Sequence, residues 1–529
     1  MPNVTIDGAT VEVPAGATIL DATARLGIAV PTLCHLDGCE RFTSCLLCVV
    51  EETATGRLLP SCSALAQDGM ALDTRTPAVR DARRMVLELL LSEHVGDCEA
   101  PCRRACPAHM DIPLMIRQIG RGELPQAIAT VKRDIALPAV LGRICPAPCE
   151  KACRRGQVDS AVSICLLKRD AADVDLAAAV PLLPPVPAAS GKRVAVVGAG
   201  PAGLAAAWYL QQLGHACTIF DEWDAPGGKL YTHVPAAELP RDVLAREIDT
   251  IRRLGVAFRQ GVRVGRDVTL TDLRASHDAV VLAVGALDAP SRAAFDVPFT
   301  DRGVKVNPET LQADVPGVFA GGAAIGVCKM AVRACADGKR MARSADLFVR
   351  GQEVSPAHKR FNCAIGRLLP GEAAEVLKLA DRGARREPAG GTAAGFTREE
   401  AAAEAARCLH CDCRKTETCR LRAYSDACGA EATRLRPETR KPLALDPSHA
   451  DVVYEPGKCI RCGLCIRVTR REGEPVGLAF VGRGYDMTIG VPFHEALGAA
   501  LQRSAAACVG ACPTGALAWK NREEAEGEA

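Results

Sequence analysis

The stretch Arg193-Val-Ala-Val-Val-Gly-Ala-Gly-Pro-Ala-Gly-Leu204 decides the fold of the middle of this chain. Its apolar start predicts a strand over Arg193–Val197, and a helix is predicted over Ala202–Leu213. The turn between them has the pattern G-x-G-x-x-G, formed by Gly198, Gly200 and Gly203. Such glycines allow backbone N–H groups and the helix N-terminus to approach a pyrophosphate. Asp221 follows the next strand, Cys217–Phe220, at a position where an acid can bind a ribose. The stretch therefore predicts a dinucleotide-binding β-α-β unit, and a glycine-rich turn without a ligand is the alternative.

The rest of the 529-residue chain is unusual for its 26 cysteines. The formal charge of +2 gives no electrostatic signature of nucleic acid or membrane binding. The N-terminus lacks a secretory signal pattern, and no apolar run is long enough to span a bilayer, so we expect a cytoplasmic protein. In such a compartment closely spaced cysteines are more often metal ligands than disulfide partners.

Composition and periodicity divide the chain into successive domains of a multidomain α/β plus α+β protein. We predict a strand-rich domain over 1–80, a helical domain over 81–180, and a nucleotide-binding domain over 191–350. A polar connector over 351–450 carries further cysteines. A compact cysteine-bearing domain follows over 451–520, and a charged tail from Asn521 is expected to be disordered.

The first cysteine group lies in the strand-rich domain. Its members are Cys34, Cys45, Cys48 and Cys62. Four thiolates on loops suit a [2Fe-2S] cluster, and a zinc site is the alternative. The spacing resembles the N-terminal [2Fe-2S] module of the large iron–sulfur subunit of respiratory complex I and of iron hydrogenases. This resemblance implies a β-grasp ferredoxin-like fold.

The second and third groups lie in the helical domain. They comprise Cys98, Cys102 and Cys106, then Cys145, Cys149 and Cys153. Both runs resemble the helical domain of the glutamate synthase small subunit family, which implies two [4Fe-4S] clusters with interleaved ligands. Two such clusters need eight ligands, so six cysteines are two short.

Two further residues are candidates for the missing ligands. His94 precedes Cys98 with the H-x3-C spacing of a His-ligated cluster in the complex I and hydrogenase families, and Cys165 follows the third group. The alternatives are a capping histidine and a small buried cysteine.

The fourth group consists of Cys408, Cys411, Cys413 and Cys419 in the connector. Four thiols so close in sequence can surround one [4Fe-4S] cluster or one zinc ion. Iron–sulfur is favoured because of the other groups.

The fifth group predicts one [4Fe-4S] cluster in a C-terminal ferredoxin-like domain. In two-cluster ferredoxins the last cysteine of each run ligates the other cluster. This rule assigns the cluster to Cys459, Cys462, Cys465 and Cys512. Thr469 replaces a cysteine that a second cluster would need, so Cys508 is expected to be unligated. Val481-Gly-Arg-Gly-Tyr-Asp486 also resembles the corresponding region of the complex I and hydrogenase subunits.

The nucleotide-binding domain resembles the FAD domain of the glutamate synthase small subunit. The resemblance extends over about residues 90–350 and implies that FAD is bound. Besides the first glycines and Asp221, it implicates Gly227, Gly228, Gly285, Gly321 and Gly322. That family has an NADPH domain inserted after the strand equivalent to Ala279–Val284, but here only 14 residues separate Gly285 from Thr300. The NADPH domain is therefore predicted to be missing, and Ala323 replaces an acid that the family has after the glycine pair.

These features predict an electron-transfer subunit of a cytoplasmic multi-subunit oxidoreductase, with FAD, one [2Fe-2S] and about four [4Fe-4S] clusters. A partner would supply a nicotinamide site or a catalytic centre of the molybdenum, tungsten, hydrogenase or 2-oxoacid oxidoreductase type. The alternatives are a self-sufficient NAD(P)H-dependent oxidoreductase and a zinc-rich scaffold. No substrate site of its own is predicted.

Overall fold

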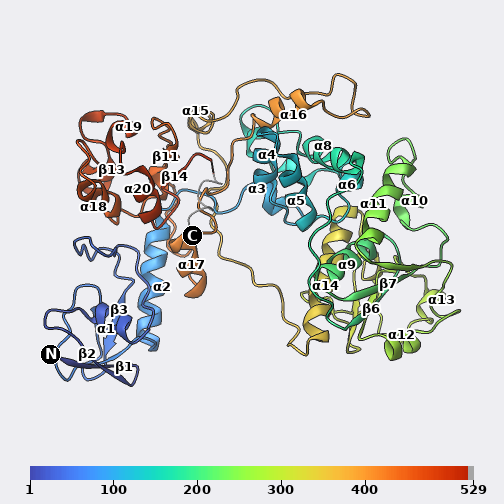
Figure 1. Ribbon diagram of the computed structural model, residues 1–529, viewed down its shortest axis with the longest axis horizontal. Helices are drawn as coiled ribbons and strands as arrows, with labels where there is room; N and C mark the ends of the chain where they lie inside the picture. The colour runs from blue at the N-terminus through green and yellow to red at the C-terminus, as the bar shows by residue number, and fades with distance from the viewer. Residues whose placement is uncertain (522–529) are drawn as a thin grey trace. The chain divides into compact units, whose positions relative to one another are not determined.

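The computed structural model describes residues 1–521, so the tail predicted to be disordered lies outside the described residues beyond Asn521. The chain forms two compact units, each made from separated segments. Unit 1 contains 1–100, 359–379 and the residues from 411 onward, and unit 2 contains 101–358 and 380–410. Figure 1 follows the chain through both units by colour.

Unit 1 begins with a five-stranded sheet in the order β2-β1-β5-β3-β4. Its strands are β1 (Asn3–Ile6), β2 (Ala9–Glu12), β3 (Val49–Glu52), β4 (Arg57–Pro60) and β5 (Ala71–Asp73). The alternating stretch at the N-terminus thus forms two antiparallel strands, because Asp7 and Gly8 adopt positive φ angles of 51° and 85° and turn the chain. Helix α1 (Ile19–Arg25) begins at a capping box formed by Thr18 and Asp21.

The other elements of unit 1 come from three parts of the sequence. They are α2 (Pro77–Ser92), α15 (Glu372–Val376), α17 (Arg420–Ala427), β11 (Val452–Tyr454), α18 (Leu464–Arg471), β12 (Ala479–Val481), β13 (Thr488–Gly490), α19 (Leu497–Ala500), α20 (Ala505–Ala511) and β14 (Leu517–Trp519). One apolar core joins α2 with the C-terminal elements, through residues such as Leu87, Leu464 and Leu517.

The first part of unit 2 is helical. It contains α3 (Pro101–Ala105), α4 (Ile112–Gly120), α5 (Leu124–Asp134), α6 (Pro138–Ile144), α7 (Pro148–Lys151), α8 (Ile164–Ala177) and, from later in the chain, α16 (Arg398–Ala405). Helices α3 to α8 lie within the region that the sequence predicted to be helical. The helical domain packs on the nucleotide-binding domain through α6 and α11 (Arg241–Arg253).

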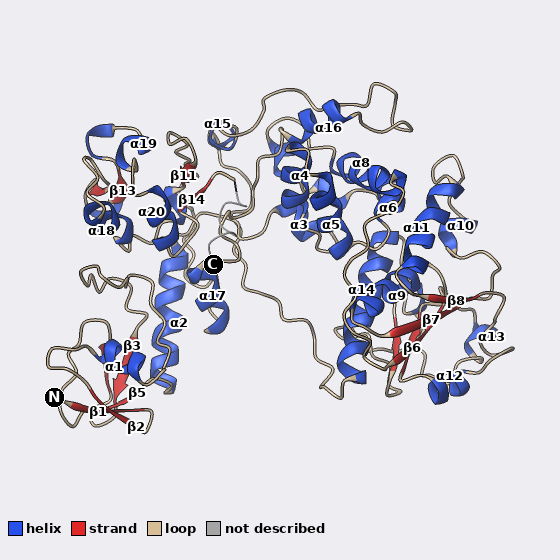
Figure 2. Cartoon of the chain, in the orientation of Figure 1, coloured by secondary structure: helices blue, strands red, loops and turns tan. Residues whose placement is uncertain are grey.

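The second part of unit 2 is a parallel sheet in the order β10-β9-β6-β7-β8. Its strands are β6 (Arg193–Val197), β7 (Ala216–Phe220), β8 (Ala257–Arg259), β9 (Ala279–Leu282) and β10 (Val318–Ala320). The associated helices are α9 (Pro201–Gln212), α10 (Lys229–Thr232), α12 (Leu270–Ser276), α13 (Ala289–Arg292) and α14 (Ala331–Val349). Helices α9 and α14 pack together beside the strands drawn in red in Figure 2. Their approach requires Gly338, where a Cβ atom would lie 2.4 Å from the carbonyl oxygen of Ala202.

Within the described part of the chain, none of the helices combines the length and apolar character needed to cross a bilayer.

Candidate functional site

The glycine turn after β6 has the three geometries that a dinucleotide loop requires. Gly198 has φ +103°, and a Cβ atom there would lie 2.5 Å from the carbonyl oxygen of Ala283. At Gly203 a Cβ atom would lie 1.9 Å from the carbonyl oxygen of Gly198, so this glycine allows the helix to pack closely on the turn. A Cβ atom on Gly200 would instead meet no atom within 4 Å. The free space at Gly200 is where a pyrophosphate could approach the backbone.

A cavity of about 700 Å³ opens at the carboxyl ends of the strands, beside this turn. Its size is typical of cofactor pockets. The predicted residues that line it are Gly198, Gly200, Asp221, Gly228 and Gly285. The structure therefore brings these five predicted residues together around one cavity, although the sequence gave no indication of its size.

The carboxylate of Asp221 organises the loops around the cavity. One oxygen accepts a hydrogen bond from the backbone N–H of Ala199 at 2.5 Å, and the other accepts from that of Trp223 at 2.9 Å. Each carboxylate oxygen can accept more than one hydrogen bond, so Asp221 can hold the glycine turn and still bind a ribose hydroxyl.

The other predicted glycines allow neighbouring loops to pack closely. Gly227 has φ +126° and lies against Leu244, while Gly321 lies against Met341. Gly322 has φ +63°, and its N–H donates to Asp337 on α14 at 3.1 Å. The contacts of Gly321 and Gly322 fix the loop that follows β10. The next residue of this loop, Ala323, lines the cavity.

Sequence reasoning missed three cations that also line the cavity: Lys229, Arg263 and Lys329. Positive side chains here suit the negative charge of a pyrophosphate. Lys229 could have been found, because it directly follows the Gly227–Gly228 pair. Arg263 and Lys329 come from loops that carry no recognisable motif.

The first cysteine group is assembled in unit 1 as two hydrogen-bonded pairs. Hydrogen bonding with Cys45 lowers the pKa of Cys34 to about 5, and hydrogen bonding with Cys48 lowers that of Cys62 to about 6. The two pairs also interact electrostatically, since Cys34 faces Cys62 and Cys45 faces Cys48. All four thiols are buried. This arrangement suits the four terminal ligands of a [2Fe-2S] cluster.

The third group gathers around a buried lysine in unit 2. The thiol of Cys165 is hydrogen-bonded with those of Cys145 and Cys149. Lys168, on the same helix as Cys165, interacts electrostatically with these three thiols and with Cys106. Cys165 thus lies among the predicted ligands, and a buried cation can balance the negative charge of a cluster held there.

This cysteine site adjoins the dinucleotide cavity. Ile144 and Pro146, the residues on either side of Cys145, both line the cavity wall. A redox group bound in the cavity would therefore be a close neighbour of a cluster bound by Cys145.

The second and fourth groups are each divided between the two units. Cys98 belongs to unit 1, whereas Cys102 and Cys106 belong to unit 2. In the fourth group Cys408 belongs to unit 2, and Cys411, Cys413 and Cys419 belong to unit 1.

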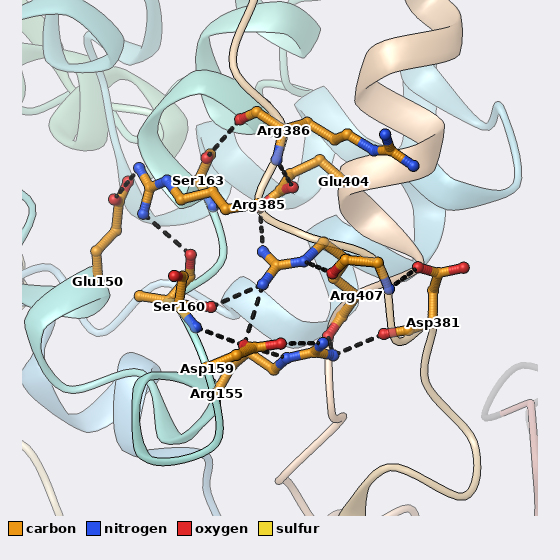
Figure 3. Close-up of polar contacts among 12 residues, drawn as sticks. Glu150, Arg155, Asp159, Ser160, Ser163, Asp381, Arg385, Arg386, Glu404 and Arg407 are labelled. Atoms are coloured by element: carbon orange, nitrogen blue, oxygen red, sulfur yellow. Dashed lines mark hydrogen bonds and ion pairs between the residues drawn. The ribbon is translucent and has the colours of Figure 1, made fainter.

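A polar network ties the backbone before Cys408 to the segment after Cys153. Arg155 donates to the carbonyl oxygen of Arg407 at 2.9 Å and to that of Asp381 at 2.8 Å. Arg407 in turn donates to the carbonyl oxygen of Ser160 at 2.9 Å. Figure 3 shows the two buried guanidinium groups side by side within this network. Cys408 and Cys153 are therefore held on neighbouring segments of unit 2.

The fifth group surrounds a small cavity of its own in unit 1, lined by Cys459, Cys462, Cys465 and Cys512. Cys508 is fully buried, and its thiol donates to the carbonyl oxygen of Cys465 at 3.7 Å. Thr469 is buried as well and donates to the carbonyl oxygen of Ile466. The arrangement is compatible with the four predicted ligands and with an unligated Cys508.

Among residues 1–521, no set of three or more His, Cys, Asp or Glu side chains is arranged to hold a single metal ion. The Cys34–Cys62 group is no exception. The distances among the side chains therefore do not favour a single metal ion at any one of the cysteine groups over the others.

Three protein-family models match the chain. A 2Fe-2S iron–sulfur cluster binding domain matches residues 2–77, and the 4Fe-4S domain II of dihydropyrimidine dehydrogenase matches residues 78–180. An NAD(P)-binding Rossmann-like domain matches residues 196–253. The first two matches confirm the prediction of [2Fe-2S] and [4Fe-4S] clusters.

The similar proteins include redox subunits from several bacteria. The chain is 41% identical over 240 residues to the NADP(+)-dependent formate dehydrogenase subunit beta of Moorella thermoacetica, which is 41% of this chain and 32% of that protein. It is 43% identical over 190 residues to the NADPH-Fe(3+) oxidoreductase subunit beta of Geobacter sulfurreducens, covering 35% of this chain and 28% of the relative.

The glutamate synthase [NADPH] small chain of Mycobacterium tuberculosis is 39% identical over 191 residues, covering 36% of this chain and 39% of the relative. These findings confirm the predicted resemblance and, with the Rossmann-like match, support FAD as the dinucleotide. The chain spans only about a third of the length of these three relatives.

Proposed function

We propose that this chain is an FAD- and iron–sulfur-containing electron-transfer subunit of a multi-subunit oxidoreductase. The observation that carries the proposal is that Ile144 and Pro146, the chain neighbours of Cys145, line the cavity beside the glycine turn. When bound, FAD takes up electrons in pairs and releases them one at a time. The residues around the cavity would hold its pyrophosphate, and Ile144 and Pro146 would bring it near a one-electron acceptor bound by Cys145.

The proposed domains are those the sequence predicted. They are a β-grasp [2Fe-2S] domain over 1–80, a helical domain with two [4Fe-4S] clusters over 81–180, an FAD domain over 191–350, a cysteine-bearing connector over 351–450 and a ferredoxin-like domain over 451–520. The mixed five-stranded sheet and the parallel sheet support the first and third of these.

The chain lacks a second nucleotide-binding domain within the described residues. Between β9 and β10 the structure has the four-residue helix α13 and loops joined by isolated bridges, and this segment forms no β-α-β unit. We therefore propose that a nicotinamide site, or a catalytic centre of the dehydrogenase, hydrogenase or 2-oxoacid oxidoreductase type, lies on a partner subunit. The names of the formate dehydrogenase and NADPH-Fe(3+) oxidoreductase subunits support such partners.

Rapid-mixing reduction of the anaerobically purified chain tests this function. We expect dithionite to bleach the flavin and the clusters, whereas NADH or NADPH alone leaves the flavin oxidised on the millisecond scale. Rapid reduction by either nucleotide would contradict the proposal and favour a self-sufficient NAD(P)H-dependent oxidoreductase. A colourless protein that contains zinc instead of iron and labile sulfide would identify a scaffold.

A further inference from the structure

Cys98 and Cys363 lie side by side in unit 1, although 265 residues separate them in the sequence. Their sulfur atoms are 3.3 Å apart, well beyond the length of about 2.05 Å expected for a disulfide bond. The backbone N–H of Cys98 donates to the carbonyl oxygen of Cys363 at 3.1 Å, and the N–H of Cys363 donates to the sulfur of Cys98 at 3.5 Å. The fold therefore brings together two free thiols from distant segments.

Cys413 and Cys419 complete a group of four. The N–H of Cys413 donates to the carbonyl oxygen of Cys98 at 3.3 Å, and the thiols of Cys413 and Cys363 interact electrostatically. Cys419 interacts in the same way with both Cys413 and Cys98. All four side chains are buried, with between 7% and 9% of each residue exposed.

We propose that Cys98, Cys363, Cys413 and Cys419 ligate one [4Fe-4S] cluster within unit 1. Four thiols from three separate segments match the four terminal ligands that such a cluster needs, and each thiol loses its proton on ligation. The site gives a role to Cys363, which lies outside the five cysteine groups identified from the sequence. This set of four ligands does not depend on which donor supplies the electrons, so the assignment goes beyond the proposed function.

Buried cations surround this group and can balance a negatively charged cluster. Arg422 and Lys458 both interact electrostatically with Cys98. Arg422 also donates to the carbonyl oxygens of Phe361 and Thr416, at 2.8 Å and 3.3 Å, so its guanidinium group is fixed in place. A Cβ atom at Gly515 would lie 2.3 Å from the sulfur of Cys413, so a glycine is needed there to leave space for that ligand.

The proposed cluster has the fifth cysteine group as its neighbour. Cys419 interacts electrostatically with Cys512, and its thiol lies 3.8 Å from the carbonyl oxygen of Pro513. Cys462 of the fifth group interacts likewise with Cys34 of the first group. The three sites therefore follow one another through unit 1, with the fifth group in the middle.

Two residues predicted from the sequence as partners of this site fit it less well. The Nδ1 atom of the half-buried His94 is buried and unpaired, but the charged groups that face the ring are Lys458 and Glu455 rather than the cysteines. Cys408 belongs to unit 2 and follows Arg407, whose carbonyl oxygen accepts from Arg155. Cys419 interacts with both Cys98 and Cys413 within unit 1 and is therefore the proposed fourth ligand.

The experiment compares Cys363→Ala with Cys428→Ala in the full-length chain, purified anaerobically. Cys428 is a half-buried cysteine of the same unit with no predicted ligand role. We expect Cys363→Ala to lose about four iron and four sulfide atoms per chain and one [4Fe-4S] signal in Mössbauer and EPR spectra. The [2Fe-2S] signal should remain, which shows that unit 1 is folded, and Cys428→Ala should match the wild type.

A second comparison separates this cluster from the one predicted by sequence spacing. Cys98→Ala should remove the same signal as Cys363→Ala, whereas Cys102→Ala should remove a different one. Unchanged iron in Cys363→Ala, loss of one common signal in Cys98→Ala and Cys102→Ala, zinc at the site, or a Cys98–Cys363 disulfide in mass spectra would each overturn the proposal.

If Cys363→Ala does not yield folded protein, Cys363→Ser decides the question. A serine oxygen that replaces one thiolate should shift the reduction potential and EPR spectrum of a single cubane. Spectra and potentials identical to those of the wild type would overturn the assignment.

Discussion

At Gly200 the methyl group of an alanine would keep a nucleotide away from the backbone. This residue has φ −73° and ψ 178°, a conformation open to any amino acid, and its missing side chain faces the cavity. The need for glycine at this position comes from the ligand and not from the fold.

Gly200→Ala should therefore keep the fold and lose flavin. The added methyl group would occupy the space where a pyrophosphate must approach the N–H groups, so we expect FAD occupancy to fall at least about tenfold while the iron content is retained. Absorbance at 450 nm and circular dichroism measure the two effects.

Gly203→Ala is the informative contrast. Its Cβ atom would lie 1.9 Å from the carbonyl oxygen of Gly198, so this variant should lose folded protein as well as flavin. Normal flavin content in Gly200→Ala would show that the pyrophosphate does not approach the backbone at Gly200.

Among the helices, α6 depends on α11 for its N-terminus. The N-cap residue of α6, Leu137, provides no side-chain cap, and Glu247 on α11 supplies one instead. Its two oxygens accept hydrogen bonds from the N–H groups of Ala139 at 2.9 Å and Val140 at 3.0 Å. Since α6 runs directly into Cys145, this contact also positions the first ligand of the third group.

The charge of Glu247 should make this contact depend on pH. Burial raises its pKa from 4.5 to about 7, despite the two backbone hydrogen bonds and the facing cations Lys132 and Arg143. The thiol of Cys335 also faces it. A carboxyl group whose pKa is higher in the folded state stabilises that state fully below about pH 4.5. This contribution to the free energy of unfolding is about 3 kcal/mol, and it is lost as the pH rises through 7.

Hydrogen exchange at pH 5 and pH 8, corrected for intrinsic rates, measures this effect on α6 and α11. Wild-type protection should be lower at pH 8, and Glu247→Gln should remove most of the difference. Asp242→Asn, which changes an exposed acid on the same helix, should behave as the wild type. An equal pH dependence in Glu247→Gln would exclude Glu247 as its origin.

On the scale of the whole molecule, Arg467 joins the first and fifth cysteine groups within unit 1. One of its nitrogens, Nη2, donates to the carbonyl oxygens of Cys34 at 2.8 Å and Cys462 at 3.1 Å. Its guanidinium group also lies 5.6 Å from the centre of the Phe42 ring, which stacks on Phe480. The planar group can hold both loops at once, which the point charge of a lysine cannot do as well.

Arg467→Ala should loosen the contact between the [2Fe-2S] site and the fifth group. We expect about tenfold faster hydrogen exchange around residues 34–42 and a weaker magnetic interaction between the two reduced clusters in EPR spectra. Arg470→Ala, an exposed arginine on the same helix, serves as the control. The same exchange rates in both variants would show that Arg467 does not hold the two sites together.

Local patterns predicted much of this protein because their causes are local. The strand Arg193–Val197 and the helices around residues 112–131 follow from apolar periodicity, and the glycine turn follows from backbone geometry that only glycine permits. The prediction that a nicotinamide domain is missing rests on counting residues between two motifs. The predicted cysteine groups likewise follow from short spacings, as in the pairs of the first group.

By itself, the sequence determined the types of domain, the dinucleotide loop and the presence of cysteine sites for iron–sulfur clusters. Only the tertiary structure decided which distant cysteines meet. It places Cys98 beside Cys363 and places Cys408 in the other unit from Cys413. Spacing can predict only ligands that a short loop brings together, whereas Cys98 and Cys363 meet because separate segments of the chain pack into one buried core.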